Sequence, residues 1–199
     1  MLTELNALRA EAVRRAGPRA LHVLGVEQEA DALAWRWGID RLAARQAALV
    51  HDITKGLSWG EQLKLCQTYG IVTVSSFGGT AEKLVHALTG AAVARHEFGL
   101  SEEVAQAVRW HTTGRAGMAL LEKVVYLADC VDSTRRHPGV FALRNLCYEN
   151  LDAALRCALE DSIRHLQDKG RPICSDTIEA REYLLRAENR LSRDEGTAI

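Results

Sequence analysis

Apolar residues recur at helical spacing along nearly the whole chain, and this pattern constrains the fold most strongly. Glycine or proline closes most of the apolar stretches. Asp40, and Ser58 with Glu61, stand where helix N-caps and a capping box belong. The pattern predicts helices over residues 2–16, 18–37, 40–51, 80–98, 101–111, 118–131, 140–148, 151–169 and 177–191, with a short helix after Ser58.

Evidence for strands is confined to residues 71–77, where Val72, Thr73 and Val74 form a β-prone run. The run is brief and has no obvious pairing strand, so we expect a loop there. No internal repeat or linker is visible. The sequence therefore predicts an all-α protein with one helical bundle over residues 18–191. An N-terminal helix at 1–17 precedes the bundle, and a flexible polar tail at 192–199 follows it.

Composition excludes several classes of protein. The 199 residues are 47% hydrophobic and carry a net charge of −1, which argues against a disordered chain and against an electrostatic nucleic-acid binder. No apolar run reaches the roughly 20 residues of a membrane span, and the charged N-terminus does not resemble a signal peptide. The five cysteines form no C-x-x-C or zinc-ribbon pattern, so we interpret them as reduced thiols. We expect a soluble, cytoplasmic protein.

A histidine and an aspartate, His51 and Asp52, stand together directly after the apolar residues 47–50. Buried charge is unfavourable unless it is paired or bound to a cation, so this doublet needs a partner, and a divalent metal is the simplest one. Consecutive helical residues point about 100° apart. The doublet therefore lies at a helix end, or its aspartate is shared between two ions.

Four further polar residues lie among apolar neighbours and could complete such a site: His22, His86, His111 and Asp129. One buried histidine alone is more often a hydrogen-bonded core residue, but the whole set favours a metal site between helices. For Asp129 the alternative is a salt bridge to Arg109 or Lys123. Histidines in charged or turn contexts are interpreted as surface residues: His96, His137 and His165. The four tryptophans are interpreted as core residues: Trp35, Trp37, Trp59 and Trp110.

Two stretches near the expected ligands are suited to phosphate. Lys55 follows the doublet by one helical turn and could hold a phosphate oxygen, although it could equally be solvated. The turn after His111 carries two hydroxyls and a guanidinium, which also suit phosphate, or it is simply a connection between helices. Its residues are Thr112, Thr113, Gly114 and Arg115.

The order His22, His51-Asp52, Asp129 resembles the signature of the HD-domain phosphohydrolase superfamily, which is all-α and metal-dependent. Four further blocks resemble the YqeK-type family of symmetrical bis(5'-nucleosyl)-tetraphosphatases within it. These blocks are His-Thr-Thr-Gly-Arg at 111–115, Tyr-Leu-Ala-Asp at 126–129, Pro-Gly-Val at 138–140 and the stretch 177–184. Together they extend the likeness over about residues 18–190.

The resemblance implies two metal ions. His22, His51, Asp52 and Asp129 would bind one ion, and Asp52, His86 and His111 the other. Iron is the family's usual metal, while manganese, cobalt and zinc also suit histidine and carboxylate ligands.

The resemblance also implies a reaction. The expected substrate is a dinucleoside polyphosphate, diadenosine tetraphosphate, cleaved into two ADP by a hydroxide that bridges the metals. Asp52, Lys55 and Arg115 are the expected catalytic residues, and Arg135 is expected to contact phosphate together with Lys55 and the turn at 112–115. A homodimer is left open.

Other functions remain open at this stage. One is a different HD-type phosphohydrolase acting on a mononucleotide or a cyclic dinucleotide, although no Gly-Tyr-Pro signature follows the doublet. Another is a nucleotide sensor without turnover, and a third is a structural helical domain whose polar residues merely pair.

Overall fold

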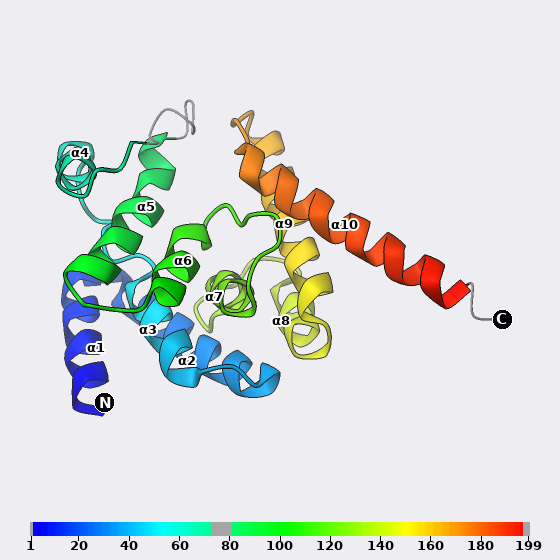
Figure 1. Cartoon of the computed structure of the whole chain (residues 1–199), viewed down its shortest axis with the longest axis horizontal. Helices are drawn as coiled ribbons and strands as arrows, with labels where there is room; N and C mark the ends of the chain where they lie inside the picture. Colours follow the sequence, from blue (N-terminus) through cyan, green and yellow to red (C-terminus); the bar gives the residue numbers. More distant parts are fainter. Residues whose placement is uncertain (1, 73–80, 197–199) are drawn as a thin grey trace.

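The computed structural model describes the backbone of residues 2–72 and 81–196 and the side chains of 4–72 and 82–190, and these ranges contain helices but no strand. Figure 1 shows the helices in chain order. Their bounds are α1 Leu2–Ala16, α2 Ala20–Trp37, α3 Arg41–Val50, α4 Trp59–Thr68, α5 Ala81–His96, α6 Glu102–Trp110, α7 Leu120–Val131, α8 Val140–Glu149, α9 Leu151–Asp168 and α10 Ser175–Gly196, with a 3-10 turn at Gly17–Arg19. The predicted all-α class is confirmed.

Two predicted helix starts have the expected capping bonds. The Asp40 side chain accepts hydrogen bonds from the backbone N–H groups of Leu42 and Ala43 at the start of α3. Ser58 and Glu61 form a reciprocal capping box at the start of α4. Because these side chains satisfy N–H groups that a helix leaves unpaired, local sequence is enough to define both starts.

Other helix ends differ from the prediction. Pro18 lies in the 3-10 turn before α2, where Gly17 has a φ of +54°, and does not start the helix itself. Ala119 is extended and its N–H donates to Glu122, so α7 begins at Leu120 and not at residue 118. The last helix continues to Gly196, past its expected end at 191. The loop expected over 71–77 lies largely outside the described residues.

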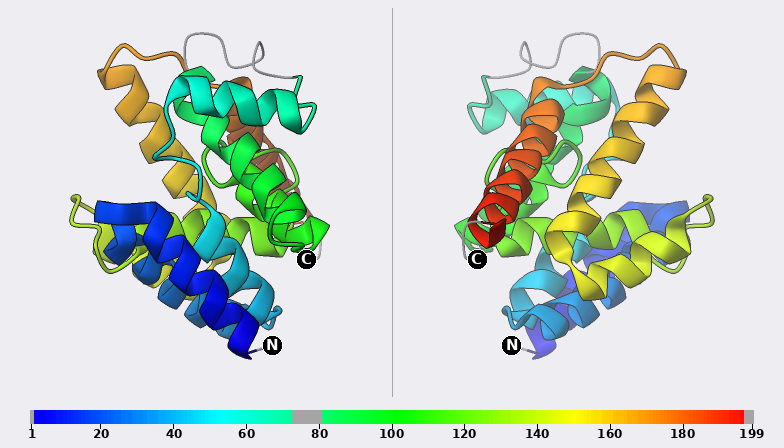
Figure 2. Two further views of the ribbon diagram at one scale, coloured as in Figure 1. Left: turned by 90° about the vertical axis from the view of Figure 1, so that its left-hand side faces the viewer. Right: turned by 90° about the vertical axis from the view of Figure 1, so that its right-hand side faces the viewer.

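Helix α7 runs through the middle of the molecule and contacts α2, α3, α6, α8 and α9 (Figure 2). Val124, Leu127 and Val131 on this helix have no exposed surface. Helix α1 joins the same core through Leu5 and Leu8. The fold therefore surrounds α7, the helix that carries Asp129, with helices from both halves of the chain.

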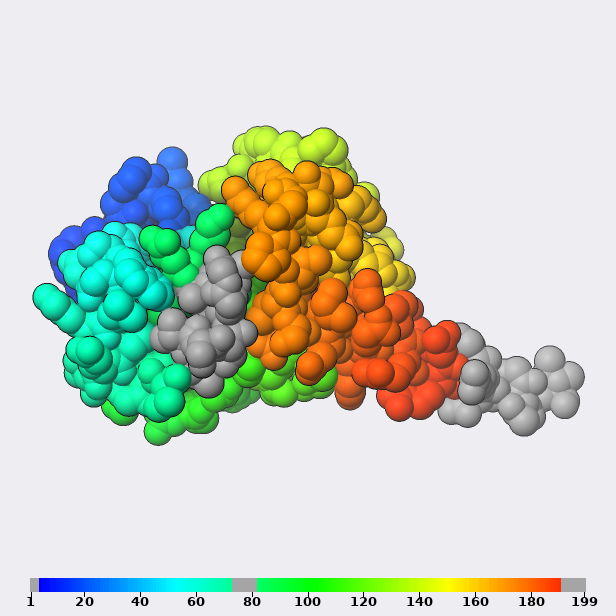
Figure 3. Space-filling model, turned by 90° about the horizontal axis from the view of Figure 1, so that it is seen from above, coloured from blue at the N-terminus to red at the C-terminus, as the bar shows by residue number. Residues whose placement is uncertain are grey.

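Helix α10 packs on α9 through its first turns, where Ala180 and Leu184 are buried. Glu188 on α10 still pairs with Arg156 on α9, and beyond it the end of α10 extends away from the other helices, as Figures 1 and 3 show. The predicted boundaries at residues 17, 191 and 199 stay predictions.

None of the helices within the described ranges combines the length and hydropathy that crossing a membrane requires. All five cysteines are unpaired, as the sequence predicts.

Candidate metal centre

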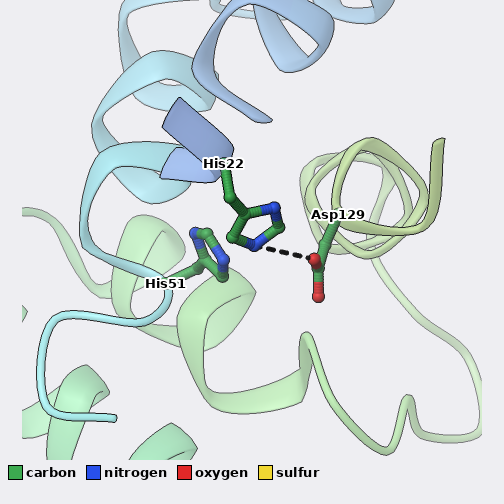
Figure 4. A group of neighbouring side chains, drawn as sticks. All are labelled: His22, His51 and Asp129. Carbon is green, nitrogen blue, oxygen red and sulfur yellow. Dashed lines mark ion pairs between the residues drawn. The ribbon is translucent and has the colours of Figure 1, made fainter. Parts of the chain in front are cut away.

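The six predicted ligands come from five helices and meet at one place. His22 lies on α2 and His51 and Asp52 directly follow α3, while α5 carries His86, α6 ends at His111, and α7 carries Asp129. Their ligand atoms form two groups, each within 4.8 Å: His22, His51 and Asp129, and beside it Asp52, His86 and His111. Figure 4 shows the first group, with His22 facing Asp129.

The doublet lies where α3 ends, as one of the two sequence alternatives requires. His51 is the C-cap of α3, and the chain then continues in tight turns, with Ile53 N–H donating to Val50 O and Lys55 N–H to Asp52 O. Apolar residues of α3 are buried up to Val50, which brings the doublet into the core. His51 and Asp52 are 0% and 4% exposed.

Asp52 faces both groups at once, one carboxylate oxygen toward each. Its Oδ2 lies 3.2 Å from His51 Nε2 and 3.8 Å from His22 Nε2. Its Oδ1 lies 3.2 Å from His86 Nε2 and 3.4 Å from His111 Nε2. This geometry suits an aspartate that is shared between two ions.

Three of the histidines have the same orientation because of their own helices. The Nδ1 atoms of His51, His86 and His111 lie 2.6, 2.8 and 2.6 Å from the backbone carbonyl oxygens of the residues three positions earlier. A carbonyl oxygen only accepts, so each Nδ1 carries a proton, which leaves Nε2 as the ring atom that can bind a metal ion. These three Nε2 atoms face Asp52.

This arrangement fits a metal ion better than it fits a core stabilised by hydrogen bonds alone. Within the described residues, buried side-chain nitrogen or oxygen atoms without a hydrogen-bond partner occur at His51 Nε2, Asp52 Oδ1 and Arg181 Nε, and the first two belong to this centre. His86 Nε2 and His111 Nε2 also face each other at 3.3 Å. Lone pairs that point at each other or at a carboxylate repel unless a proton or cation lies between them.

The pKa values of side chains in this centre are shifted by burial and by neighbouring charges. Burial lowers the pKa of His86 to about 4, so this imidazole is neutral, the form that binds metals. Burial also opposes protonation of His22, yet hydrogen bonds to Asp129, Asp132 and Asp52 raise its pKa to about 10. Burial raises the pKa of the Asp52 carboxyl, but nearby His51, His111 and His22 hold it well below its usual range.

Three cationic side chains border the carboxylates. Arg19 Nη2 contacts Asp52 Oδ2, and Lys55 Nζ lies 3.0 Å from the same oxygen. Arg135 Nη2 contacts Asp129 Oδ1. These three side chains are 33–41% exposed, so they connect the buried carboxylates with the surface.

Sequence reasoning missed two residues of this cluster, Arg19 and Asp132. Arg19 stands three residues before His22, and Asp132 three residues after Asp129. Spacing of one helical turn from an expected ligand was the signal that could have found both.

The residues of the turn after His111 make different contacts from Lys55 and Arg135, which pair with carboxylates of the centre. Arg115 donates to Glu122 at 3.0 Å and lies against the ring of Trp110. Thr113 is buried and its hydroxyl donates to Gly114 O. Thr112 and Thr113 line a cavity of about 130 Å³. The roles predicted for these residues stay predictions.

The salt-bridge alternative for Asp129 was wrong for Lys123. Lys123 pairs with Asp152, and the cation that contacts Asp129 is Arg135, one turn beyond the end of α7. The three histidines that were interpreted as surface residues are exposed: His96, His137 and His165.

The prediction of four core tryptophans was wrong for Trp35 and Trp59, whereas Trp37 packs against the core. Trp35 is 73% exposed and Trp59 36% exposed. Trp37 and Trp110 are only half-buried, and the indole N–H of Trp37 donates to Cys147 O. The apolar pattern alone does not show whether the helix face that carries each tryptophan is covered by another helix.

Comparison with known proteins supports the same centre. The sequence model of the family described as HD domain matches residues 19–134. A symmetrical bis(5'-nucleosyl)-tetraphosphatase of Halalkalibacterium halodurans is 37% identical over 84% of this chain and 89% of that protein. The protein of the same name from Bacillus subtilis is 34% identical over the same shares.

A solved structure is similar over almost the full chain. It is a crystal structure from Clostridium acetobutylicum, described as a predicted HD superfamily hydrolase involved in NAD metabolism. It has a TM-score of 0.86 and 34% sequence identity, and the match covers 92% of this chain and 97% of that one.

Proposed function

This chain belongs to the HD-domain family, and from that premise we propose that it hydrolyses diadenosine tetraphosphate symmetrically, giving two molecules of ADP. The observation that carries the proposal is the meeting of four histidines and two aspartates, in which His51 Nε2 and Asp52 Oδ1 are buried without a hydrogen-bond partner. Relatives that are 37% and 34% identical to this chain over 168 residues are named as enzymes of this activity.

The two groups of side chains suit two divalent cations. His22, His51 and Asp129 would hold one cation, His86 and His111 the other, and Asp52 would contribute to both. Such cations, when bound, neutralise charge on phosphate oxygens and lower the pKa of a coordinated water toward 7. Histidine and carboxylate ligands suit iron, manganese, cobalt and zinc, and we propose iron on the family's analogy.

Arg19, Lys55 and Arg135 would bind the phosphates of the substrate. Each now contacts a carboxylate of the centre and is partly exposed. A tetraphosphate carries several negative charges, and charge-assisted hydrogen bonds from guanidinium and ammonium groups would fix its inner phosphates beside Asp52 and Asp129. Lys55 and Arg135 thus keep the phosphate-binding role predicted from the sequence, and Arg19 joins them.

The cavity lined in part by Thr112 and Thr113 suits the base of one nucleoside of the substrate. It is lined by Lys83, Leu84, Thr112, Thr113, Ser162, Leu166, Arg171, Pro172, Cys174 and Thr177. Apolar side chains would cover a base while hydroxyls meet its polar edge, as in most small-molecule sites. The cavity adjoins the centre through Thr112, which follows His111, and through Lys83, whose carbonyl oxygen holds the His86 ring.

The test is a product analysis. Purified protein is incubated with diadenosine tetraphosphate and Mn²⁺, Co²⁺ or, without oxygen, Fe²⁺, and the nucleotides are separated by chromatography. We expect ADP as the product, two per substrate, and no reaction with a chelator. AMP with ATP would contradict the symmetrical cut, and metal-dependent binding without products would favour the nucleotide sensor. Turnover confined to mononucleotides or cyclic dinucleotides would favour the other HD-type activities.

The expected homodimer and the cytoplasmic location stay predictions. Light scattering after size exclusion would test the first, and fractionation of cells the second.

A further inference from the structure

The four histidines of the centre differ in what holds their Nδ1 atoms. In His51, His86 and His111 the partner is a carbonyl oxygen of the same helix or its last turn, which the fold supplies whatever the neighbouring side chains are. In His22 the partner is a side chain, Asp132, whose Oδ2 lies 3.2 Å from His22 Nδ1. The orientation of His22 thus depends on one replaceable group.

Asp132 is itself held firmly. It has no exposed surface and directly follows α7. Its Oδ1 accepts hydrogen bonds from both the N–H and the hydroxyl of Thr134, at 2.8 and 2.6 Å. Arg135 Nε donates to Oδ2 at 3.1 Å, and Arg144 donates to the backbone carbonyl of Asp132 at 3.1 Å. The side chain therefore has little freedom to turn away from His22.

Helix α2 leaves room for this carboxylate at Gly25, one turn after His22. A Cβ at position 25 would lie 2.9 Å from Asp132 Oδ1 and 3.2 Å from Ser133 Oγ. Glycine inside a helix is destabilising relative to alanine. The close approach of Asp132 gives a physical reason for glycine at this place.

We propose that Asp132 is a positioning residue that accepts the Nδ1 proton of His22 and so keeps His22 Nε2 directed at the cation shared with His51 and Asp129. The inference rests on the proposed metal-dependent function. Carboxylates that hold a ligating histidine in this way fix its tautomer and its ring orientation.

The variant Asp132→Asn tests whether the carboxylate fixes the proton on His22 Nδ1, because an amide side chain has nearly the same shape as a carboxylate. The Thr134 N–H can only donate, so the amide oxygen has to stay on that side, and the amide NH₂ has to face His22 and also Arg135 Nε, which loses its acceptor there. Nδ1 would then have to accept, and the proton would move to Nε2, the atom that should bind the cation. Gly25→Ala is the second variant, which keeps the carboxylate but pushes it from its place.

Zinc alone is the probe. Competition with a chelator measures its affinity for the protein. ¹⁵N NMR of the zinc-loaded protein measures which ring nitrogen of His22 carries a proton. We expect a zinc affinity about 10 to 100-fold lower for Asp132→Asn and about tenfold lower for Gly25→Ala. In wild type His22 should carry its proton on Nδ1, and in Asp132→Asn this signal should be lost. Asp152→Asn, the same change at an exposed residue paired with Lys123, should match wild type.

Two results would overturn the inference. One is a zinc affinity of both variants within twofold of wild type. The other is a loss of affinity in which His22 keeps its Nδ1 proton, because Asp132 would then act through charge or stability and not through the ring. If Asp132→Asn does not fold, the zinc affinity of Gly25→Ala decides, and a value within twofold of wild type would overturn the inference. Wild type that binds no zinc would instead contradict the metal centre itself, and this inference with it.

Discussion

Asp52 is the residue on which both groups of ligands depend. It is the member of the cluster whose two oxygens face different sets of histidines, at 3.2 to 3.8 Å. Its position after α3 makes this possible, because the chain leaves the helix there and the carboxylate is no longer confined to one helix face. One side chain therefore connects what would otherwise be two separate sites.

Replacing this carboxylate should remove metal and activity together. For Asp52→Asn we expect at least a hundredfold loss of turnover and clearly less bound metal, because an amide has no charge to offset a cation and its NH₂ faces one group of histidines. Elemental analysis and the product assay measure the two effects on one preparation.

Asp31→Asn is the matched control, since Asp31 pairs with Arg41 at the surface and such pairs contribute little. Full metal content and full turnover in Asp52→Asn would mean that the centre is not the site of the reaction.

At the scale of helices, a buried polar network joins α4 and α5 to the turn that carries the doublet. The Thr89 hydroxyl donates to Gln62 Oε1 at 2.6 Å, and Gln62 Nε2 donates to Thr54 O at 2.6 Å. The Thr54 hydroxyl donates to His86 O at 3.0 Å. These bonds tie the segment after Asp52 to the helix of His86, so α4 supports the centre without contributing a ligand.

Thr89→Val tests this network because valine keeps the volume and removes the hydroxyl. Gln62 Oε1 would lose its donor while buried, and we expect the free energy of unfolding to fall by about 1–3 kcal/mol. Urea unfolding of the metal-free protein measures it. Thr68→Val, which removes an exposed hydroxyl of α4 that donates to Lys64 O, should change the free energy by less than about 0.5 kcal/mol. Equal effects of the two changes would refute the network's role.

At the scale of the whole molecule, the centre joins helices that are distant in the chain. His22 and Asp129 are 107 positions apart, yet their side chains lie 3.3 Å from each other because α2 and α7 pack together. A ligand that binds this folded arrangement and not the unfolded chain stabilises the fold. The centre is therefore also a structural junction.

Adding metal should raise the melting temperature. At a free metal concentration one hundred times the Kd, binding stabilises by about 2.7 kcal/mol, which for a domain of this size corresponds to an increase of about 5–10 °C. The increase is measured as the difference in melting temperature, by calorimetry, between the wild-type protein with Mn²⁺ and the same protein with a chelator. Asp52→Asn should show almost none of this shift, and an equal shift in that variant would place the stabilising metal elsewhere.

Prediction from sequence succeeded where local chemistry is decisive. Asp40 and Ser58 cap their helices as expected, because capping needs only neighbouring N–H groups. The six predicted ligands were singled out because polar residues inside apolar helices need an explanation, and the structure brings their side chains together. Trp35 was misplaced, since apolar composition says little about which helix face another helix covers.

By itself the sequence determined that this chain folds into helices and which polar side chains those helices bury, because periodicity, caps and apolar neighbours act over a few residues. The tertiary structure decided which of those side chains meet. It turned one oxygen of Asp52 toward each group, brought Arg19 beside it, and paired Asp132 with His22. Such contacts depend on how α2, α3 and α7 cross, and packing between segments distant in the chain sets those crossings.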